Sequence, residues 1–188
     1  MTNINDSDLK KIVDEVVSGI MREMPSQMTP VPVGTPAPSA AGPRIVAIGA
    51  DHGGYPMKEN LKAFLEEKGF EVIDCGTNST DSVDYPDFAK AVAEQVSSGL
   101  AWRGVMIDGA GIGSCMAANK VRGVRAAMCY DYATAFNSRE HNNANLLTLG
   151  AGLIGPNLAK QILTTFLETE FGGDRHARRV DKIMEIEK

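Results

Sequence analysis

The chain has 188 residues, of which 43% are hydrophobic and 23% charged, and its formal net charge is −5. Its length fits one domain with a sizeable core, and its negative charge argues against general nucleic-acid binding. No apolar run approaches the ~18 residues that span a bilayer, and charges interrupt the first 24 residues, so we expect neither a membrane span nor a secretory signal. Three cysteines without CxxC spacing indicate reduced thiols rather than a disulfide framework or a zinc site. The sequence thus predicts a cytoplasmic protein.

An amphipathic helix is predicted over residues 6–24, within a first segment that covers residues 1–24. Its apolar residues are Leu9, Ile12, Val13, Val16, Val17, Ile20, Met21 and Met24. They recur in steps that place them on one helix face. Pro25 follows directly and is expected to end the helix.

A linker is predicted over residues 25–43, which contain six of the nine prolines. Such a composition cannot bury enough apolar surface to fold, so we expect an extended, disordered tether. Two interpretations of the tethered helix stay open. It packs back on its own domain or on a dimer partner, or it is a docking peptide for a groove on another protein.

From residue 44 to residue 188, strand and helix patterns alternate, which predicts an α/β domain with a parallel sheet. The expected strands are 45–50, 71–75, 104–108, 124–129 and 145–149. The expected helices are 56–68, 86–98, 114–120, 132–139, 155–170 and 177–187.

Polar residues follow three of the predicted strands where each strand ends. Residues 51–54 (DHGG) follow the first strand, Asp108 ends the third, and Asp131 lies just after the fourth. Ligands of open parallel sheets bind beyond the carboxyl ends of the strands. We therefore expect a binding site at this edge.

A glycine-rich loop follows Asp108, with Gly109, Gly111 and Gly113 at alternate positions. A backbone without side chains allows an anion to approach successive N–H groups. One alternative is a dinucleotide site, because Asp131 lies 20 residues after Gly111. However, the spacing is GxGxG rather than GxGxxG and the loop follows the third strand. A P-loop is excluded, because no Gly-Lys-Ser/Thr follows.

The three histidines form a second set of candidates. His52 and His141 are expected in polar loops at the same sheet edge, whereas His176 lies in a basic cluster near the C-terminus. That cluster also contains Arg175, Arg178 and Arg179. Local basic residues in an acidic chain suit one phosphate group, and the alternative is a solvated helix face.

The segment from residue 44 to residue 188 resembles the ribose-5-phosphate isomerase B family, which includes the galactose-6-phosphate isomerase subunits. The matching motifs are GADHGG (49–54), VIDCGT (72–77), DYPDFA (84–89), DGAGIGSCMAANKVRGVRAA (108–127), SREHNNANLLTLG (138–150) and GGDRHARRV (172–180). The resemblance implies a Rossmann-like three-layer α/β/α domain with a five-stranded parallel sheet. It also implies a homodimer or dimer of dimers with sites at the subunit interface, and interconversion of aldose and ketose phosphates without a metal or organic cofactor.

The resemblance assigns roles to residues at both ends of the domain. It implies that Asp51 holds a sugar hydroxyl or the ring oxygen, that His52 helps to bind phosphate, and that Tyr85 lies beside the sugar. The backbone of the loop would hold the enediolate oxygen; its expected binding residues are Gly109, Ala110, Gly111 and Gly113. His141 would open the sugar ring from the partner subunit. Asn142 would lie near His141, and Arg175 and Arg179 would bind the phosphate.

The chain departs from this family at the catalytic base. Asp108 stands where one branch has a cysteine, and Ala110 where that branch has a threonine. A second branch has a glutamate base where this chain has Ser114, and Cys115 is out of phase with either base. A carboxylate in a closed site is a competent base beside a carbonyl. We therefore expect Asp108 to abstract the C2 proton.

Three functional hypotheses follow from the departures. The first is an isomerase of ribose 5-phosphate, the second an isomerase of another sugar phosphate of four to six carbons, and the third a sugar-phosphate binding protein that has lost the catalytic activity.

Residues 1–43 lie outside the family match. Residues 6–24 with their tether resemble encapsulation peptides, which implies a microcompartment shell protein as partner and a microcompartment as an alternative location.

Overall fold

The computed structural model describes residues 44–187 together with Lys11 and Glu15. Lys11 and Glu15 are helical and exposed. The rest of the predicted helix over residues 6–24, and the predicted linker over residues 25–43, lie outside the described residues.

The domain from residue 44 onward contains one parallel sheet with a helix after each strand. The strands are β1 (Ile45–Ala50), β2 (Glu71–Asp74), β3 (Arg103–Asp108), β4 (Ala126–Met128) and β5 (Leu146–Gly150), in the order β2-β1-β3-β5-β4. The helices are α2 (Tyr55–Glu67), α3 (Tyr85–Ser97), α4 (Ile112–Ala118), α5 (Tyr132–Glu140), α6 (Pro156–Glu168) and α7 (Asp174–Met184), and the short 3₁₀ helix η1 (Glu185–Glu187) follows. The predicted five-stranded α/β fold is confirmed. The fourth strand is shorter than expected, and α4 and α7 begin earlier.

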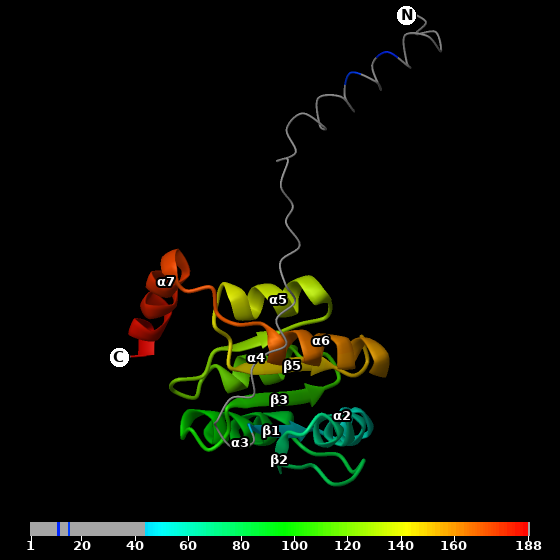
Figure 1. Cartoon of the computed structure of the whole chain (residues 1–188). Coiled ribbons are helices and arrows are strands. Elements are labelled where there is room, and N and C mark those ends of the chain that lie inside the picture. Colours follow the sequence, from blue (N-terminus) through cyan, green and yellow to red (C-terminus); the bar gives the residue numbers. More distant parts are fainter. Residues whose placement is uncertain (1–10, 12–14, 16–43, 188) are drawn as a thin grey trace, which may run out of the picture. The chain divides into compact units, whose positions relative to one another are not determined.

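Helices cover both faces of the sheet and produce three layers (Figure 1). Val46 and Ile48 of β1 face a core that is shared with α2, α5 and α6, whereas Ala47 faces a second core with α3 and α4. Adjacent residues of a strand point to opposite faces, so a buried parallel strand needs apolar residues at every position. The apolar run of β1 follows from this requirement.

The two edges of the sheet carry different functional residues. The turns after β1 and β3 lie at the carboxyl edge, as predicted. His141 was expected at this edge, and that expectation was wrong. It follows the last residue of α5, and the helix returns the chain to the amino edge, where β5 starts at Leu146. In a β-α-β unit the helix crosses the sheet before the next parallel strand begins.

At the amino edge, Trp102 packs against two arginines. The guanidinium carbons of Arg44 and Arg103 are each 4.3 Å from the centre of the Trp102 ring system, and Phe70 stacks on it at 6.4 Å. This group forms where the chain enters the domain, just before β1.

In the part of the chain that the structure describes, no helix combines the length and apolar character that a membrane crossing requires.

Candidate functional site

The glycine-rich loop between β3 and α4 is held by the carboxylate of Asp108. Oδ1 accepts hydrogen bonds from the backbone N–H groups of Ala110, at 2.8 Å, and Gly111. Oδ2 accepts from both the backbone N–H, at 3.1 Å, and the hydroxyl of Ser114. Gly111 adopts φ +79° at the start of α4, a left-handed conformation that favours glycine. The loop therefore closes around the carboxylate that precedes it.

Asp108 has no spare acceptor position in this arrangement. A carboxylate offers about four lone-pair sites, four donors face it, and the residue is 4% exposed. Three donors are backbone N–H groups that the loop fixes, whereas the Ser114 hydroxyl can rotate. The role of Asp108 as the base stays a prediction, and it requires that hydroxyl to turn away from Oδ2.

The contact between Asp108 and Ser114 joins the two positions at which members of the resembled family carry the catalytic base. These positions lie six residues apart in the sequence, yet their side chains touch in the structure. Either position therefore places a base at the same point of the loop. Cys115 points elsewhere, because its thiol donates to the carbonyl of Ala126 at 3.4 Å, and burial raises its pKa.

The turn after β1 lies beside this loop. The N–H of Asp51 donates to the carbonyl of Ile107 on β3 at 3.1 Å, which places Asp51 next to Asp108 at the carboxyl edge. Asp51 Oδ1 accepts from the N–H of Gly54 at 2.9 Å, and Oδ2 has no hydrogen-bond partner among residues 44–187. Nδ1 of His52 lies 3.2 Å from both the backbone N and O of Val83.

Tyr85 packs against the glycine loop at Gly113. It is the first residue of α3, is 39% exposed, and its ring packs on Gly113. A Cβ at position 113 would lie 2.5 Å from the Tyr85 Cζ atom, so the Tyr85 ring can pack on this position only because residue 113 is a glycine. Gly109 is exposed and Ala110 half-buried. The structure therefore brings together Asp51, Asp108, Tyr85 and residues 109–113, which we call the carboxyl-edge site.

Apart from His52, whose ring lies against Val83, the other predicted residues form a separate group, the His–Arg cluster, defined as His141, Asn142, Arg175, His176 and Arg179. The rings of His141 and His176 stack at 4.3 Å with an angle of 12°. Nε of Arg175 lies 3.4 Å from Nε2 of His176. Loss of solvent contact, and then the positive neighbours His141, Arg175 and Arg179, lower the pKa of His176.

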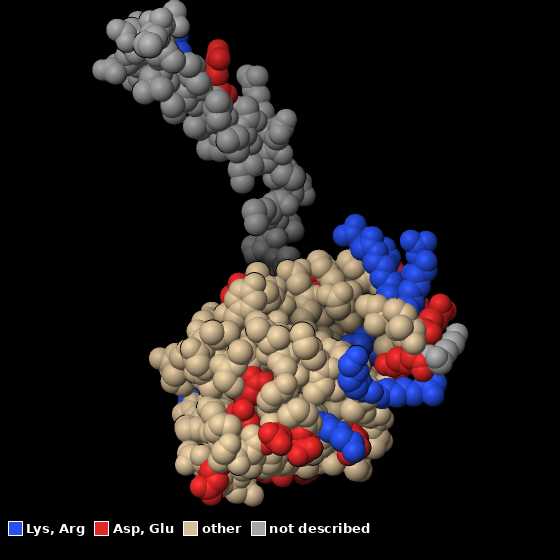
Figure 2. Space-filling view, turned by 180° about the vertical axis from the view of Figure 1, so that it is seen from behind, with Lys and Arg blue, Asp and Glu red and all other residues tan. Residues whose placement is uncertain are grey.

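The His–Arg cluster lies on the flank of the molecule that carries α7. Arg175, Arg178, Arg179 and Lys182 are exposed on this helix, and Figure 2 shows basic side chains gathered on this flank. Asn142 is also exposed, and its amide donates to the carbonyl of Asn137 at 3.2 Å. His141, the first residue of the cluster, lies at the amino edge. Within one chain, the His–Arg cluster and the carboxyl-edge site therefore lie at opposite ends of the strands.

Asp131 has a structural function that the dinucleotide interpretation did not anticipate. Its carboxylate accepts from the N–H and the hydroxyl of Thr134, at 2.7 and 2.8 Å, and caps α5. A side chain with this capping geometry is not directed at a ribose. The structure therefore does not support a dinucleotide site.

Sequence reasoning missed an ion pair that supports the carboxyl edge. Nζ of the fully buried Lys58 lies 2.7 Å from Asp74 at the end of β2, and Asp74 also accepts from the N–H of Gly76. The N–H of Ala50 donates to the carbonyl of Gly76 at 2.7 Å, just before Asp51. A lysine among the apolar positions of α2 was the available signal. No cluster of three His, Cys, Asp or Glu side chains that could hold a metal occurs among the described residues.

Comparison with known proteins identifies the family of the domain. A family model described as Ribose/Galactose Isomerase matches residues 46–183. The ribose-5-phosphate isomerase B of Escherichia coli is 42% identical over 142 residues, 76% of this chain and 95% of that protein. The D-erythrulose-4-phosphate isomerase of Pectobacterium atrosepticum is 42% identical over 139 residues, 73% of this chain and 91% of that protein.

Solved structures show the same likeness. That of the ribose-5-phosphate isomerase B of Clostridium thermocellum matches with a TM-score of 0.75 and 53% identity, covering 76% of this chain and 97% of that one. Both the sequence and the fold of the domain are thus shared with sugar-phosphate isomerases. The chain therefore belongs to the ribose/galactose isomerase family.

Proposed function

We propose that the protein is an aldose–ketose isomerase that interconverts ribose 5-phosphate and ribulose 5-phosphate without a metal or organic cofactor. The observation that carries this proposal is the carboxyl-edge site, where the glycine-rich loop closes around Asp108 and Asp51 follows the neighbouring strand β1. The two relatives named for a pentose phosphate and a tetrose phosphate are equally identical to this chain. An isomerase of another sugar phosphate of four to six carbons is therefore the alternative.

The reaction needs one proton acceptor and one site for negative charge. Asp108 takes the proton from C2 of the open-chain aldose, and the electron pair forms the C1–C2 double bond of the enediolate while the carbonyl electrons move onto O1. The proton of the C2 hydroxyl then passes to O1, C2 becomes the carbonyl, and Asp108 returns its proton to C1. The N–H groups of Ala110, Gly111 and Ser114 already bond to Asp108. The enediolate oxygen would thus be bound by the N–H groups of Gly109 and Gly113. Fixed donors at a developing charge are a large source of catalysis.

The site is completed in a homodimer, because the carboxyl-edge site and the His–Arg cluster of one chain lie at opposite edges of the sheet and cannot meet. In the proposed dimer the His–Arg cluster of one protomer covers the carboxyl-edge site of its partner. Arg175 and Arg179 bind the phosphate, and His141 opens the sugar ring. Incorporation of solvent deuterium into the sugar tests the proposal. Binding of the sugar phosphate without isotope exchange would instead identify a non-catalytic binding protein.

The phosphate assignment predicts a selective effect of one arginine. Arg179→Ala should raise KM for ribose 5-phosphate about tenfold or more and weaken inhibition by inorganic phosphate, since charge-assisted hydrogen bonds to phosphate are strong. Arg178→Ala, on the same exposed helix, is the matched control and should leave both constants close to wild type. Equal effects of the two substitutions would show that α7 contributes only general positive charge.

We further propose that residues 6–24 direct the cytoplasmic enzyme to a microcompartment shell protein. The support is the apolar stripe in the sequence, since helices this short need a partner surface to be stable in water.

Deletion of residues 1–40 should leave isomerase activity and the dimer intact. Residues 1–24 fused to a fluorescent protein should bind the shell protein, and Val13→Asp with Val17→Asp should abolish binding. Lys11→Ala with Glu15→Ala, at exposed positions, is the control. Loss of the dimer on deletion would make the helix structural.

A further inference from the structure

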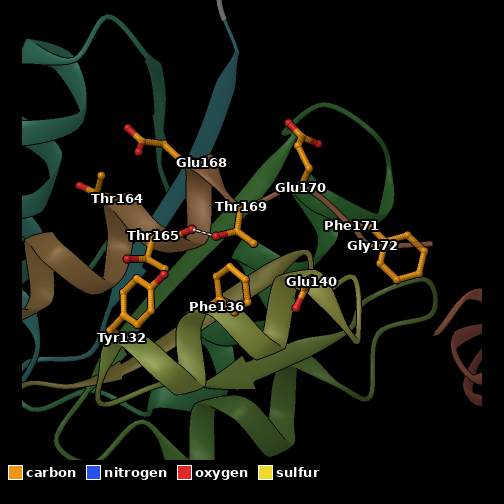
Figure 3. A pocket seen from close by; sticks show the side chains of 10 residues that line it. All are labelled: Tyr132, Phe136, Glu140, Thr164, Thr165, Glu168, Thr169, Glu170, Phe171 and Gly172. Carbon is orange, nitrogen blue, oxygen red and sulfur yellow. Dashed lines mark hydrogen bonds between the residues drawn. The ribbon is translucent and has the colours of Figure 1, made fainter. Parts of the chain in front are cut away.

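Glu140 occupies a position between the His–Arg cluster and the rest of the domain. It is the last residue of α5 and lies at one end of a groove of about 470 Å³ between α5 and α6, which Glu168 and Glu170 also line (Figure 3). Its side chain is also directed at the next residue. Oε2 of Glu140 lies 3.0 Å from Nε2 of His141, with the two side chains 37% and 38% exposed.

Three further contacts fix this pair. The N–H of His141 donates to the carbonyl of Asn137 at 3.0 Å, which holds its backbone at the end of α5. The His176 ring covers one face of the His141 ring at 4.3 Å. The carbonyl of Glu140 accepts from the N–H of Gly172 at 2.9 Å, so Glu140 also anchors the segment that leads to α7.

Gly172 packs closely against Glu140. A Cβ at position 172 would lie 3.2 Å from the Glu140 carbonyl oxygen and 3.3 Å from its Cγ atom. Such contacts are tighter than ordinary van der Waals distance. A side chain at position 172 would therefore press on Glu140, which would have to shift by a few tenths of an ångström.

We propose that Glu140 is a positioning residue that directs His141 for opening of the sugar ring. This inference rests on the proposed isomerase function. A carboxylate that bonds to one ring nitrogen of histidine keeps the proton on that nitrogen and fixes the plane of the ring. With Nε2–H held by Glu140, Nδ1 is the nitrogen available to a substrate.

The step that this arrangement serves is the opening of the furanose form of ribose 5-phosphate. The proton of the 1-hydroxyl leaves to Nδ1 of His141, the C1–O4 bond breaks to give the aldehyde, and Nδ1 passes the proton on to O4. The sugar neither gains nor loses a proton overall. Ribulose 5-phosphate has no such ring, because the oxygen that would close it carries the phosphate.

Ribose 5-phosphate requires ring opening before proton transfer at carbon, whereas ribulose 5-phosphate requires the proton transfer alone. Comparing the two substrates therefore isolates the ring-opening step. Glu140→Gln keeps the shape of the side chain and removes its charge. It should slow isomerisation of ribose 5-phosphate on the order of tenfold to 100-fold, a part of the 10²–10⁴ that general acid–base catalysis contributes. Entry of solvent deuterium into C1 of ribulose 5-phosphate should fall less than about threefold, because no ring opens before that exchange.

Two variants make the test independent of a single substitution. Gly172→Ala presses on Glu140 without changing its charge, and should slow isomerisation of ribose 5-phosphate less than Glu140→Gln does while leaving the exchange at C1 unchanged. Glu168→Gln removes a charge from the same groove without a contact to His141, and both rates should stay close to wild type.

The outcomes distinguish this inference from the proposed function. If Glu140→Gln slows both reactions equally, or neither, Glu140 does not position His141 and the inference is overturned. If the wild-type protein itself shows neither isomerisation nor exchange, the isomerase function fails, whatever the variants do.

Discussion

Asp108→Asn is expected to lower turnover of ribose 5-phosphate about 100-fold or more, the usual effect of removing a general base. It should also lower the free energy of unfolding by about 2–4 kcal/mol, because the new amide NH₂ faces fixed N–H donors or the Ser114 hydroxyl. Turnover by kinetic assay and stability by denaturant unfolding measure the two effects separately.

Ser114→Ala separates the base from its supporting contacts. It removes the hydroxyl donor to Oδ2 and leaves the carboxylate in place, so it should cost about 1–2 kcal/mol of stability. If Asp108 is the base, Ser114→Ala keeps deuterium exchange within about tenfold of wild type while Asp108→Asn loses it. If both variants lose exchange to the same extent, Asp108 acts only by holding the loop. Cys115→Ser should have little effect in either case.

Two inactive variants should restore activity when they are combined in one dimer. Asp108→Asn damages the carboxyl-edge site and His141→Asn damages the His–Arg cluster, which lie at opposite edges of one chain. In the proposed dimer each active site takes one group from each copy. A mixed dimer therefore contains one intact site and one site with both defects, and should have about half of the wild-type activity per dimer.

The mixed dimer is obtained by co-expression with two different affinity tags and purification through both. Asp108→Asn combined with Asp51→Asn is the control, because both substitutions lie in the same group and neither site of that dimer is intact. Activity with ribose 5-phosphate in the first pair and none in the control supports sites shared between copies. Inactivity of both pairs would place each complete site within one chain.

The carboxyl-edge site could be predicted from the sequence because it depends on a local rule. Parallel strands end at one edge, so Asp51 and Asp108 had to lie close together once β1 and β3 were recognised as strands. The same rule places His141 at the amino edge, because it lies between the end of a helix and the start of the next strand. The polar sequence around His141 was instead interpreted as a loop at the carboxyl edge. The end of the helix before β5 decides its actual position.

The contacts of Asp108 and Glu140 could not be predicted in this way. Four donors reach Asp108 only because Gly111 adopts a positive φ and reverses the loop onto the residue that precedes it. The stack of His141 on His176 joins residues 35 positions apart in the sequence, and it depends on where α7 lies after Gly173, which adopts a positive φ. Periodicity and motif spacing contain no information on either geometry.

Trp102 gives the protein a built-in optical reporter. It is the one tryptophan of the chain, and the guanidinium groups of Arg44 and Arg103 lie against its ring system. Indole emission responds to nearby charge and to water, so the whole tryptophan signal comes from the point where residues 1–43 join the domain. A shift in the emission spectrum when a partner binds the N-terminal segment would show that the event reaches the enzyme. An unchanged spectrum would show that this binding leaves the surroundings of Trp102 as they were.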